Sequence, residues 1–191
     1  MIDARNIAAI MLAAGTSRRF GTGDKLIAPL AGAPLALHAA RRISGLAPGR
    51  RIAVCSDEGG LLARMLASEG FEIVANPHPE RGLSQSLACG IANAARGPAA
   101  AALVCLADMP FVSTGHLQNL LARFDPVTAP VVASSNGEAA TPPALFDRTL
   151  FDRLRAVEGD RGGKALLAGA ALVAAAAGEL ADIDRPDDLP R

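Results

Sequence analysis

The apolar run IAAIM at residues 7–11 leads directly into the segment LAAGTSRRFGTGDK at residues 12–25. Such a run is typical of a strand buried on both faces. The segment that follows combines Gly15 with the cations Arg18, Arg19 and Lys25. Backbone N–H groups beside a glycine and nearby cationic side chains can hold a polyphosphate. The stretch therefore predicts a buried first strand with a nucleotide-binding loop at its end.

The spacing of this loop differs from the two commonest phosphate-binding motifs. A P-loop requires a second glycine five residues after the first, and Phe20 stands there. A G-x-G-x-x-G dinucleotide motif could begin at Gly21, but Leu26 occupies the place of its third glycine. Both motifs are thus disfavoured. On generic grounds, Gly15 could also be an ordinary turn glycine and the cations a solvated patch.

Short apolar runs alternate with helical patterns along the chain, which indicates parallel strands joined by crossover helices. Strands are expected over residues 7–13, 51–55, 71–75, 101–106 and 130–135, and helices over 34–44, 58–68, 83–95 and 115–124. We therefore expect a single domain of the α/β class, a three-layer α/β/α sandwich with a Rossmann-like, mostly parallel sheet. Residues 1–136 would form the nucleotide-binding core. The pattern after Gly137 is irregular, and we expect residues 137–191 to form a C-terminal capping region that contacts the second substrate.

Composition narrows the class of ligand. The 191 residues are 50% hydrophobic and carry a formal net charge of +0, with no Trp or Tyr and only six Phe. A neutral chain with few aromatic rings lacks the features that bind nucleic acid, so a small-molecule ligand is expected. The three cysteines form no C-x-x-C pair, and no apolar stretch has the roughly 20 residues of a membrane span. We expect a cytoplasmic protein that binds neither nucleic acid nor membrane.

Two acidic segments are candidate metal ligands. Asp108 follows the apolar strand at residues 103–106, where a carboxylate would be held at the sheet edge and could bind Mg²⁺. Asp182 and Asp184 alternate in DIDRPDDL at residues 182–189, so an extended chain would put both on one side. The alternative for Asp108 is a helix cap, and for the second segment a plain acidic tail.

Three segments together resemble the molybdenum cofactor cytidylyltransferases, a family of nucleotidyltransferases with guanylyl-transferring relatives. These are the loop at residues 12–25, LADMP at residues 106–110 and DID at residues 182–184. The resemblance implies catalytic roles for Lys25, Arg19 and Asp108, and a Mg²⁺ or Mn²⁺ ion bound by Asp108 and Asp184, with Asp182 as the other candidate. Nucleotide-binding residues would be Leu12, Ala13, Ala14, Gly15, Ser17, Arg19, Lys25, Asn76, Ser86 and Gly90.

Asn76, Ser86 and Gly90 match the family's base-reading segment, whereas generic grounds alone favour Ser84 or Ser86 as a simple cap of the helix at residues 83–95. The guanylyl-transferring relatives tend to carry glycine where Ala14 stands, which favours CTP. Segments at residues 141–146 and 158–164 are similar to the family's acceptor-binding segments, with Pro142 in place of a frequent histidine and Lys164 in place of arginine. They imply acceptor-binding roles for Pro143, Asp160, Arg161 and Lys164.

The resemblance thus implies transfer of CMP from CTP to the terminal phosphate of molybdenum–molybdopterin, with release of pyrophosphate and transient contact with a recipient molybdoenzyme. Three alternatives stay open. The chain could transfer a guanylyl or cytidylyl group to a sugar or polyol phosphate. It could carry the molybdenum cofactor without catalysis, or be a nucleotide-binding regulator.

Overall fold

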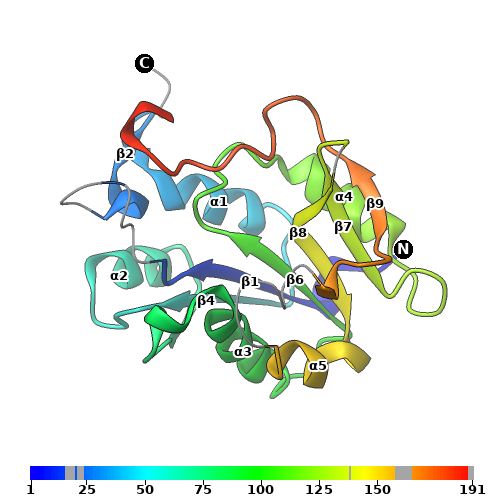
Figure 1. The fold of residues 1–191 in the computed structure, drawn as a ribbon. Coiled ribbons are helices and arrows are strands. Elements are labelled where there is room, and N and C mark those ends of the chain that lie inside the picture. Colours follow the sequence, from blue (N-terminus) through cyan, green and yellow to red (C-terminus); the bar gives the residue numbers. More distant parts are fainter. Residues whose placement is uncertain (16–19, 21–23, 138, 158–164, 189–191) are drawn as a thin grey trace.

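The computed structural model describes residues 1–15, 20, 24–137, 139–157 and 165–188. Its centre is a seven-stranded sheet with the strand order β5-β4-β1-β6-β8-β7-β9 (Figure 1). The strands are β1 (Ile7–Ala13), β4 (Arg50–Cys55), β5 (Glu72–Ala75), β6 (Ala101–Leu106), β7 (Val131–Ser135), β8 (Ala140–Asp147) and β9 (Ala171–Ala174). Strand β8 runs antiparallel to β6 and β7, and the other strand pairs are parallel. The predicted mostly parallel sheet is confirmed.

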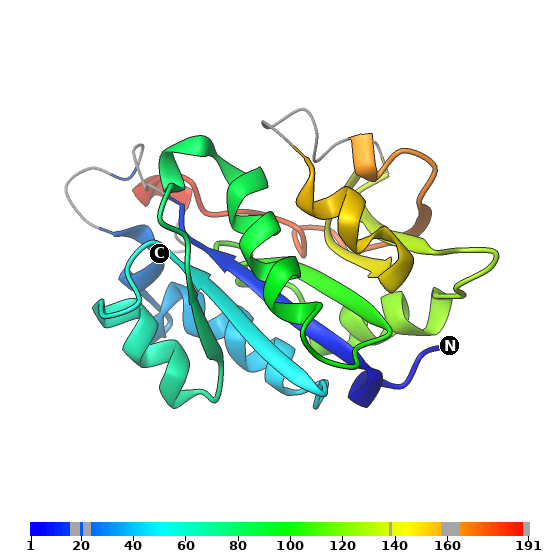
Figure 2. The same cartoon turned by 90° about the horizontal axis from the view of Figure 1, so that it is seen from below.

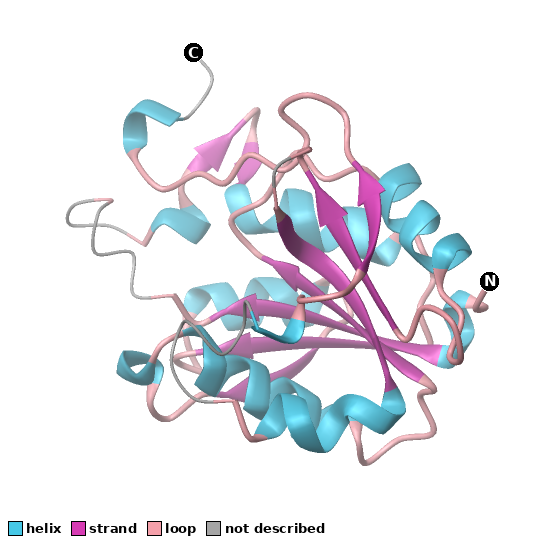
Figure 3. Cartoon of the chain, turned by 45° about the vertical axis from the view of Figure 1, so that its right-hand side comes forward, coloured by secondary structure: helices cyan, strands magenta, loops and turns pink. Residues whose placement is uncertain are grey.

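Helices cover both faces of this sheet (Figures 2 and 3). They are α1 (Leu35–Ser44), α2 (Leu61–Ser68), α3 (Leu83–Ala94), α4 (Thr114–Arg123) and α5 (Phe151–Arg155). A small hairpin of β2 (Pro29–Leu30) and β3 (Ala33–Pro34) precedes α1. The five strands and four helices expected from the sequence are all present, with boundaries shifted by up to three residues.

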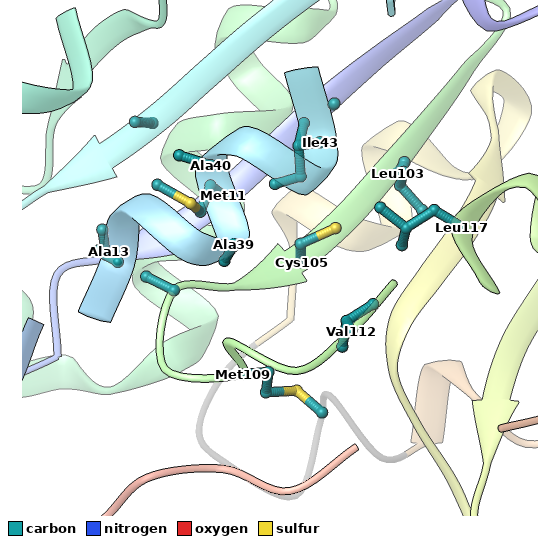
Figure 4. Packing of buried hydrophobic residues seen from close by; sticks show 14 of the residues in the cluster. Met11, Ala13, Ala39, Ala40, Ile43, Leu103, Cys105, Met109, Val112 and Leu117 are labelled. Carbon is teal, nitrogen blue, oxygen red and sulfur yellow. The ribbon is translucent and has the colours of Figure 1, made fainter. Parts of the chain in front are cut away.

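The two halves of the core follow from the alternation of side chains along the strands. In β1, Met11 belongs to a buried cluster shared with α1, α2 and α4, whereas its neighbour Ile10 belongs to one shared with α3 and α5. Figure 4 shows Met11 beside Ala40 of α1, and Leu103 of β6 beside Leu117 of α4. The expected three-layer α/β/α sandwich is therefore present.

Beyond Gly137 the chain is more regular than its sequence pattern predicted. Strand β8 inserts between β6 and β7, β9 pairs with β7, and α5 packs on α3. The pattern concealed β8 because it contains Pro142 and Pro143, which cannot donate to a ladder and usually mark edge strands or bulges. Here the β7–β8 register shifts beside these prolines, which lets an interior strand tolerate them.

The last described segment returns across the fold to the β2–β3 side (Figure 1). Pro186–Asp188 forms a short 3₁₀ helix there. In the described part of the chain, no helix is both long and apolar enough to cross a membrane.

Candidate active site

A cavity of about 230 Å³ opens where β1 and β6 end. Ligand sites in such sheets lie outside the carboxyl ends of the strands, at the place this cavity occupies. Eleven described residues line it: Leu12, Ala14, Gly15, Lys25, Leu26, Pro79, Gly82, Leu83, Ser86, Leu106 and Asp108. Six of these were predicted from the sequence as site residues, and they come from three separate segments.

Lys25 is the centre of a charge cluster at this cavity. Its Nζ lies 2.7 Å from Oδ2 of Asp108 and 3.0 Å from Oδ1 of Asp184. The side chain of Lys25 is only 9% exposed, against 22% for Asp108 and 39% for Asp184. The structure thus brings together three residues that are 83 and 159 positions apart in sequence.

Local structure holds each of these side chains in place. Asp24 caps the 3₁₀ helix Lys25–Ile27 by accepting a hydrogen bond from the backbone N–H of Leu26 at 3.0 Å. The backbone N–H of buried Ile183 donates to the carbonyl of Asp108 at 3.0 Å, which fixes the tail beside β6. The Asp188 carboxylate accepts from the N–H groups of Asp184 and Arg185. Asp184 therefore sits in a short capped turn anchored on the core.

Electrostatics favour a charged Lys25 in this cluster. Burial disfavours the ammonium form, but the hydrogen bonds and charges of Asp108 and Asp184 outweigh that cost, so the pKa of Lys25 is raised above its ordinary value. Counting only the described members of the cluster, two carboxylates face one ammonium. A lysine that stays protonated can later transfer its donors to a phosphate oxygen without losing its charge.

The same cluster has the donors that a divalent cation requires. Within the described residues, Oδ1 of Asp108 is buried and has no hydrogen-bond partner, which is costly for a carboxylate oxygen. Mg²⁺ is commonly held by one or two carboxylates together with phosphate oxygens and water. No group of three or more His, Cys, Asp or Glu residues that could hold a metal occurs in the described ranges. Asp108 and Asp184 therefore fit a metal that a bound nucleotide helps to coordinate.

Ser86 faces the same cavity from α3. Its Oγ accepts a hydrogen bond from Nδ2 of buried Asn76 at 2.9 Å, and Oδ1 of Asn76 accepts from the N–H of His78. Among the described residues, Ser86 Oγ acts only as a hydrogen-bond acceptor, so its proton is available to a ligand. Asn76 is fully buried and does not line the cavity, so the hydrogen bond to Ser86 is what connects it to the cavity.

Two glycines determine how α3 begins and how closely it packs on the sheet. Gly82, which precedes the helix, has φ 86° and ψ −170°, a backbone region open essentially to glycine alone. A Cβ on Gly90 would lie 2.5 Å from Cγ2 of Ile10 and 3.1 Å from Cγ2 of Val54. Gly90 therefore lets α3 pack closely on β1 and β4, and it does not line the cavity. Its contacts are with the core.

The remaining predicted residues lie elsewhere. Ala13 is buried at the end of β1, beside the cavity-lining Leu12 and Ala14. Asp182 is exposed whereas Asp184 is half-buried, although the two are separated by a single residue. Ser17, Arg19, Asp160, Arg161 and Lys164 lie outside the described residues.

A second cavity, of about 280 Å³, adjoins the first and shares Leu12, Leu83 and Leu106 with it. Its other described lining residues are Ser84, Leu87, Val104, Ala140, Thr141, Pro142, Ala144, Phe146, Leu166 and Leu167. None of these side chains is charged. Pro142 lines this cavity, whereas Pro143 faces a much smaller cavity lined also by Leu117.

Sequence reasoning missed several lining residues. Leu26, Pro79, Leu83 and Leu106 were not predicted, because an apolar side chain in a site carries no chemical signature. The ion pairs of Lys25 were also missed, since its loop position suggested a contact with phosphate alone. The only available signal was that Lys25, Asp108 and Asp184 all belong to the segments that carry the family resemblance.

An α/β sheet with a lysine–carboxylate cluster at the ends of its first and central strands is an arrangement suited to nucleotide chemistry. Residues 9–177 match the MobA-like NTP transferase domain family. The chain belongs to this family and is therefore a nucleotidyltransferase.

Two curated proteins are similar to most of the chain. The chain is 33% identical over 192 residues to the purine catabolism protein PucB of Bacillus subtilis (strain 168), covering 94% of this chain and 92% of PucB. It is 29% identical over 141 residues to a probable molybdenum cofactor guanylyltransferase of Haloferax mediterranei, covering 74% of this chain and 66% of that protein.

Solved structures share the fold. The crystal structure of Rv0371c from Mycobacterium tuberculosis H37Rv superposes with a TM-score of 0.81 at 21% identity, covering 96% of this chain and 95% of that one. A manganese complex of Rv0371c superposes with a TM-score of 0.71 at 18% identity, covering 89% and 88% of the two chains.

Proposed function

We propose that this protein transfers CMP from CTP to the terminal phosphate of molybdenum–molybdopterin and releases pyrophosphate. The observation that carries the proposal is the cluster in which Lys25 lies within 3.0 Å of both Asp108 and Asp184 at the strand-end cavity. Nucleotidyl transfer depends on positioning and charge neutralisation, because the attacking phosphate oxygen is already ionised at neutral pH. The cluster has the charges that this chemistry needs.

The nucleotide is proposed to bind with its base beside Ser86 and its phosphates beside Gly15 and Lys25. Ser86 Oγ has a proton to donate to a base acceptor such as the cytosine carbonyl. A Cβ on Gly15 would meet no atom of the described residues within 4 Å, and phosphate is proposed to occupy the space beside it. Leu12, Ala13 and Ala14 would let the base approach the backbone. Ser17 and Arg19 are proposed to contact the triphosphate from the same loop. Asn76, which follows β5, and Gly90, on α3, are proposed to support the nucleotide site by orienting Ser86 and by letting α3 pack closely on the sheet.

Asp108 and Asp184 would hold a divalent ion, Mg²⁺ or Mn²⁺, and the exposed Asp182 is the weaker candidate. When bound, such an ion would neutralise phosphate charge. Lys25 would donate hydrogen bonds to the departing pyrophosphate while its raised pKa keeps it protonated. Asp108 would hold Lys25 in place with its carboxylate, and its backbone carbonyl would hold the segment around Ile183 and Asp184.

The acceptor is proposed to occupy the second cavity, which adjoins the first. Pro143 would act from the strand that forms one wall. Asp160, Arg161 and Lys164 would bind the acceptor's polar edge, which is consistent with Leu166 and Leu167, a few residues later, lining this cavity. Delivery to a recipient molybdoenzyme would need a transient contact with that enzyme.

A guanylyl transfer is the second candidate, favoured by the name of the Haloferax mediterranei relative. One experiment separates the candidates. The purified chain is incubated with Mg²⁺, with CTP or GTP, and with molybdenum–molybdopterin, a sugar phosphate or no acceptor, and pyrophosphate is measured.

We expect pyrophosphate with CTP and molybdenum–molybdopterin only. Release with GTP instead would contradict the base assignment, and release with a sugar phosphate would contradict the acceptor. Binding of the cofactor without any pyrophosphate would identify a carrier.

A further inference from the structure

Three buried polar groups form a hydrogen-bonded chain away from the first cavity. Nε2 of His116, on α4, lies 2.8 Å from Oγ of Ser134 on β7. Ser134 Oγ in turn donates to the carbonyl oxygen of Pro143 on β8 at 2.7 Å. His116 is 3% exposed and Ser134 0%. A serine hydroxyl can donate one hydrogen bond, and that of Ser134 goes to the Pro143 carbonyl. The His116 ring must therefore donate from Nε2–H to Ser134 Oγ.

These hydrogen bonds lie where the β7–β8 ladder is interrupted. Ala133 is opposite Ala144, but the next residue, Ser134, is opposite Thr141, so Pro142 and Pro143 fall in a bulge. Proline has no N–H with which to hold itself in a ladder. The Ser134 hydroxyl supplies the hydrogen bond that fixes this segment.

The two prolines of the bulge face different cavities. Pro143 lines the small cavity beside Leu117 of α4, on the side of His116. Pro142 and Thr141 line the large second cavity together with Phe146 and Leu87 of the α3 side. The residue that accepts the Ser134 hydrogen bond on one side of the sheet is therefore adjacent to a residue that lines the second cavity on the other side.

We propose that His116 and Ser134 are positioning residues for the second substrate, because they hold the Pro142–Pro143 segment that forms a wall of the second cavity. This inference rests on the proposed function, in which that cavity takes the phosphorylated acceptor. Burying a histidine and a serine in a largely apolar layer costs desolvation, which an all-apolar contact would avoid. The requirement for a fixed wall explains why polar groups are buried here.

The test measures the two substrates separately. His116→Leu and Ser134→Ala each remove a hydrogen bond from the series His116–Ser134–Pro143. In His116→Gln, the side-chain amide can still donate to Ser134. With CTP and molybdenum–molybdopterin, we expect the first two variants to raise the KM for the acceptor by about tenfold and the KM for CTP by less than about twofold. His116→Gln should stay close to wild type.

Leu120→Ala is the matched control for lost stability. Leu120 is fully buried on the same helix and is not part of the hydrogen-bonded chain. Hydrogen exchange over residues 140–145 should rise in His116→Leu and stay unchanged in Leu120→Ala. If His116→Leu does not fold, Ser134→Ala gives the same test, because it removes the shared hydroxyl without adding bulk.

The outcomes separate the two claims. Equal changes in both KM values, or the same split in Leu120→Ala, would overturn the positioning role while the proposed function stands. A wild-type chain that transfers CMP to no acceptor would overturn the proposed function itself.

Discussion

Replacing Lys25 with methionine keeps the length and packing of the side chain and removes its charge. Asp108 and Asp184 would then face each other without the ammonium that lies 2.7 and 3.0 Å from their oxygens. Removing one partner of a fully buried ion pair costs about 3–5 kcal/mol. Here the aspartate side chains are 22% and 39% exposed, so water screens part of the repulsion. We expect a loss of about 1–3 kcal/mol in the free energy of unfolding.

The same variant should lose catalysis by a larger factor. A cation that acts on the transition state contributes on the order of 3 kcal/mol, so kcat/KM for CTP should fall about 100-fold. Urea denaturation measures the first effect and pyrophosphate release the second. Mg²⁺ should restore more stability to Lys25→Met than to wild type, because two carboxylates without the ammonium attract a cation more strongly.

Arg41→Met is the matched control for this experiment. Arg41 is 54% exposed and forms a 3.0 Å ion pair with Glu69 on the surface. Its loss should cost no more than about 1 kcal/mol and leave turnover unchanged. The reasoning about Lys25 is refuted if Lys25→Met matches Arg41→Met in both stability and turnover.

Three further predictions concern α3 and α4. Gly90→Ala should destabilise the fold by about 1–3 kcal/mol in urea denaturation, because the added Cβ would meet Ile10 at 2.5 Å. Gly115→Ala is the control and should not destabilise the fold, because the nearest atom to its Cβ lies at 3.8 Å. Equal stabilities of the two variants would contradict the packing argument. Ser86→Ala should lower kcat/KM for CTP about tenfold, and Ser84→Ala, in the second cavity, should leave the KM for CTP unchanged; the reverse pattern would move the base site. Burial lowers the pKa of His116 below its ordinary value of 6.5, although the charge of Glu179 opposes this shift. At a pH between the pKa of His116 in the unfolded protein and its lower pKa in the folded protein, the unfolded protein therefore binds more protons than the folded one. Stability should therefore fall as pH drops below 6.5, by up to about 1.4 kcal/mol per pH unit, and His116→Gln should remove this slope in denaturation curves; an unchanged slope would rule out His116 as its source.

The parts of the fold that the sequence predicted are those with a clear period and a clear end. The run at residues 7–11 became β1, and LADMP placed Asp108 just beyond β6. Because β1 and β6 are adjacent and parallel, their carboxyl ends meet, and the segments that follow them share a cavity. Neighbouring strand ends therefore explain why Gly15 and Asp108 could be brought together from sequence alone.

Long-range features were not predictable in the same way. Strand β8 has two prolines and an antiparallel direction, and its place between β6 and β7 depends on a register shift that no local pattern encodes. Alternation put Asp182 and Asp184 on one side, but only the capped turn at Asp188 and the contact with Lys25 distinguish Asp184. The orienting hydrogen bond from Asn76 to Ser86 likewise requires the loop after β5 to reach α3.

The central claim is that the loop lysine and two distant aspartates form one nucleotide and metal site. Calorimetric titration of CTP in the presence of Mn²⁺ tests it most directly, with Asp108→Asn, Asp184→Asn and the exposed neighbour Asp182→Asn compared against wild type. We predict that the first two variants weaken CTP binding by at least about tenfold and that Asp182→Asn binds as wild type does. Wild-type affinity in Asp108→Asn and Asp184→Asn, or an equal loss in Asp182→Asn, would contradict a shared site.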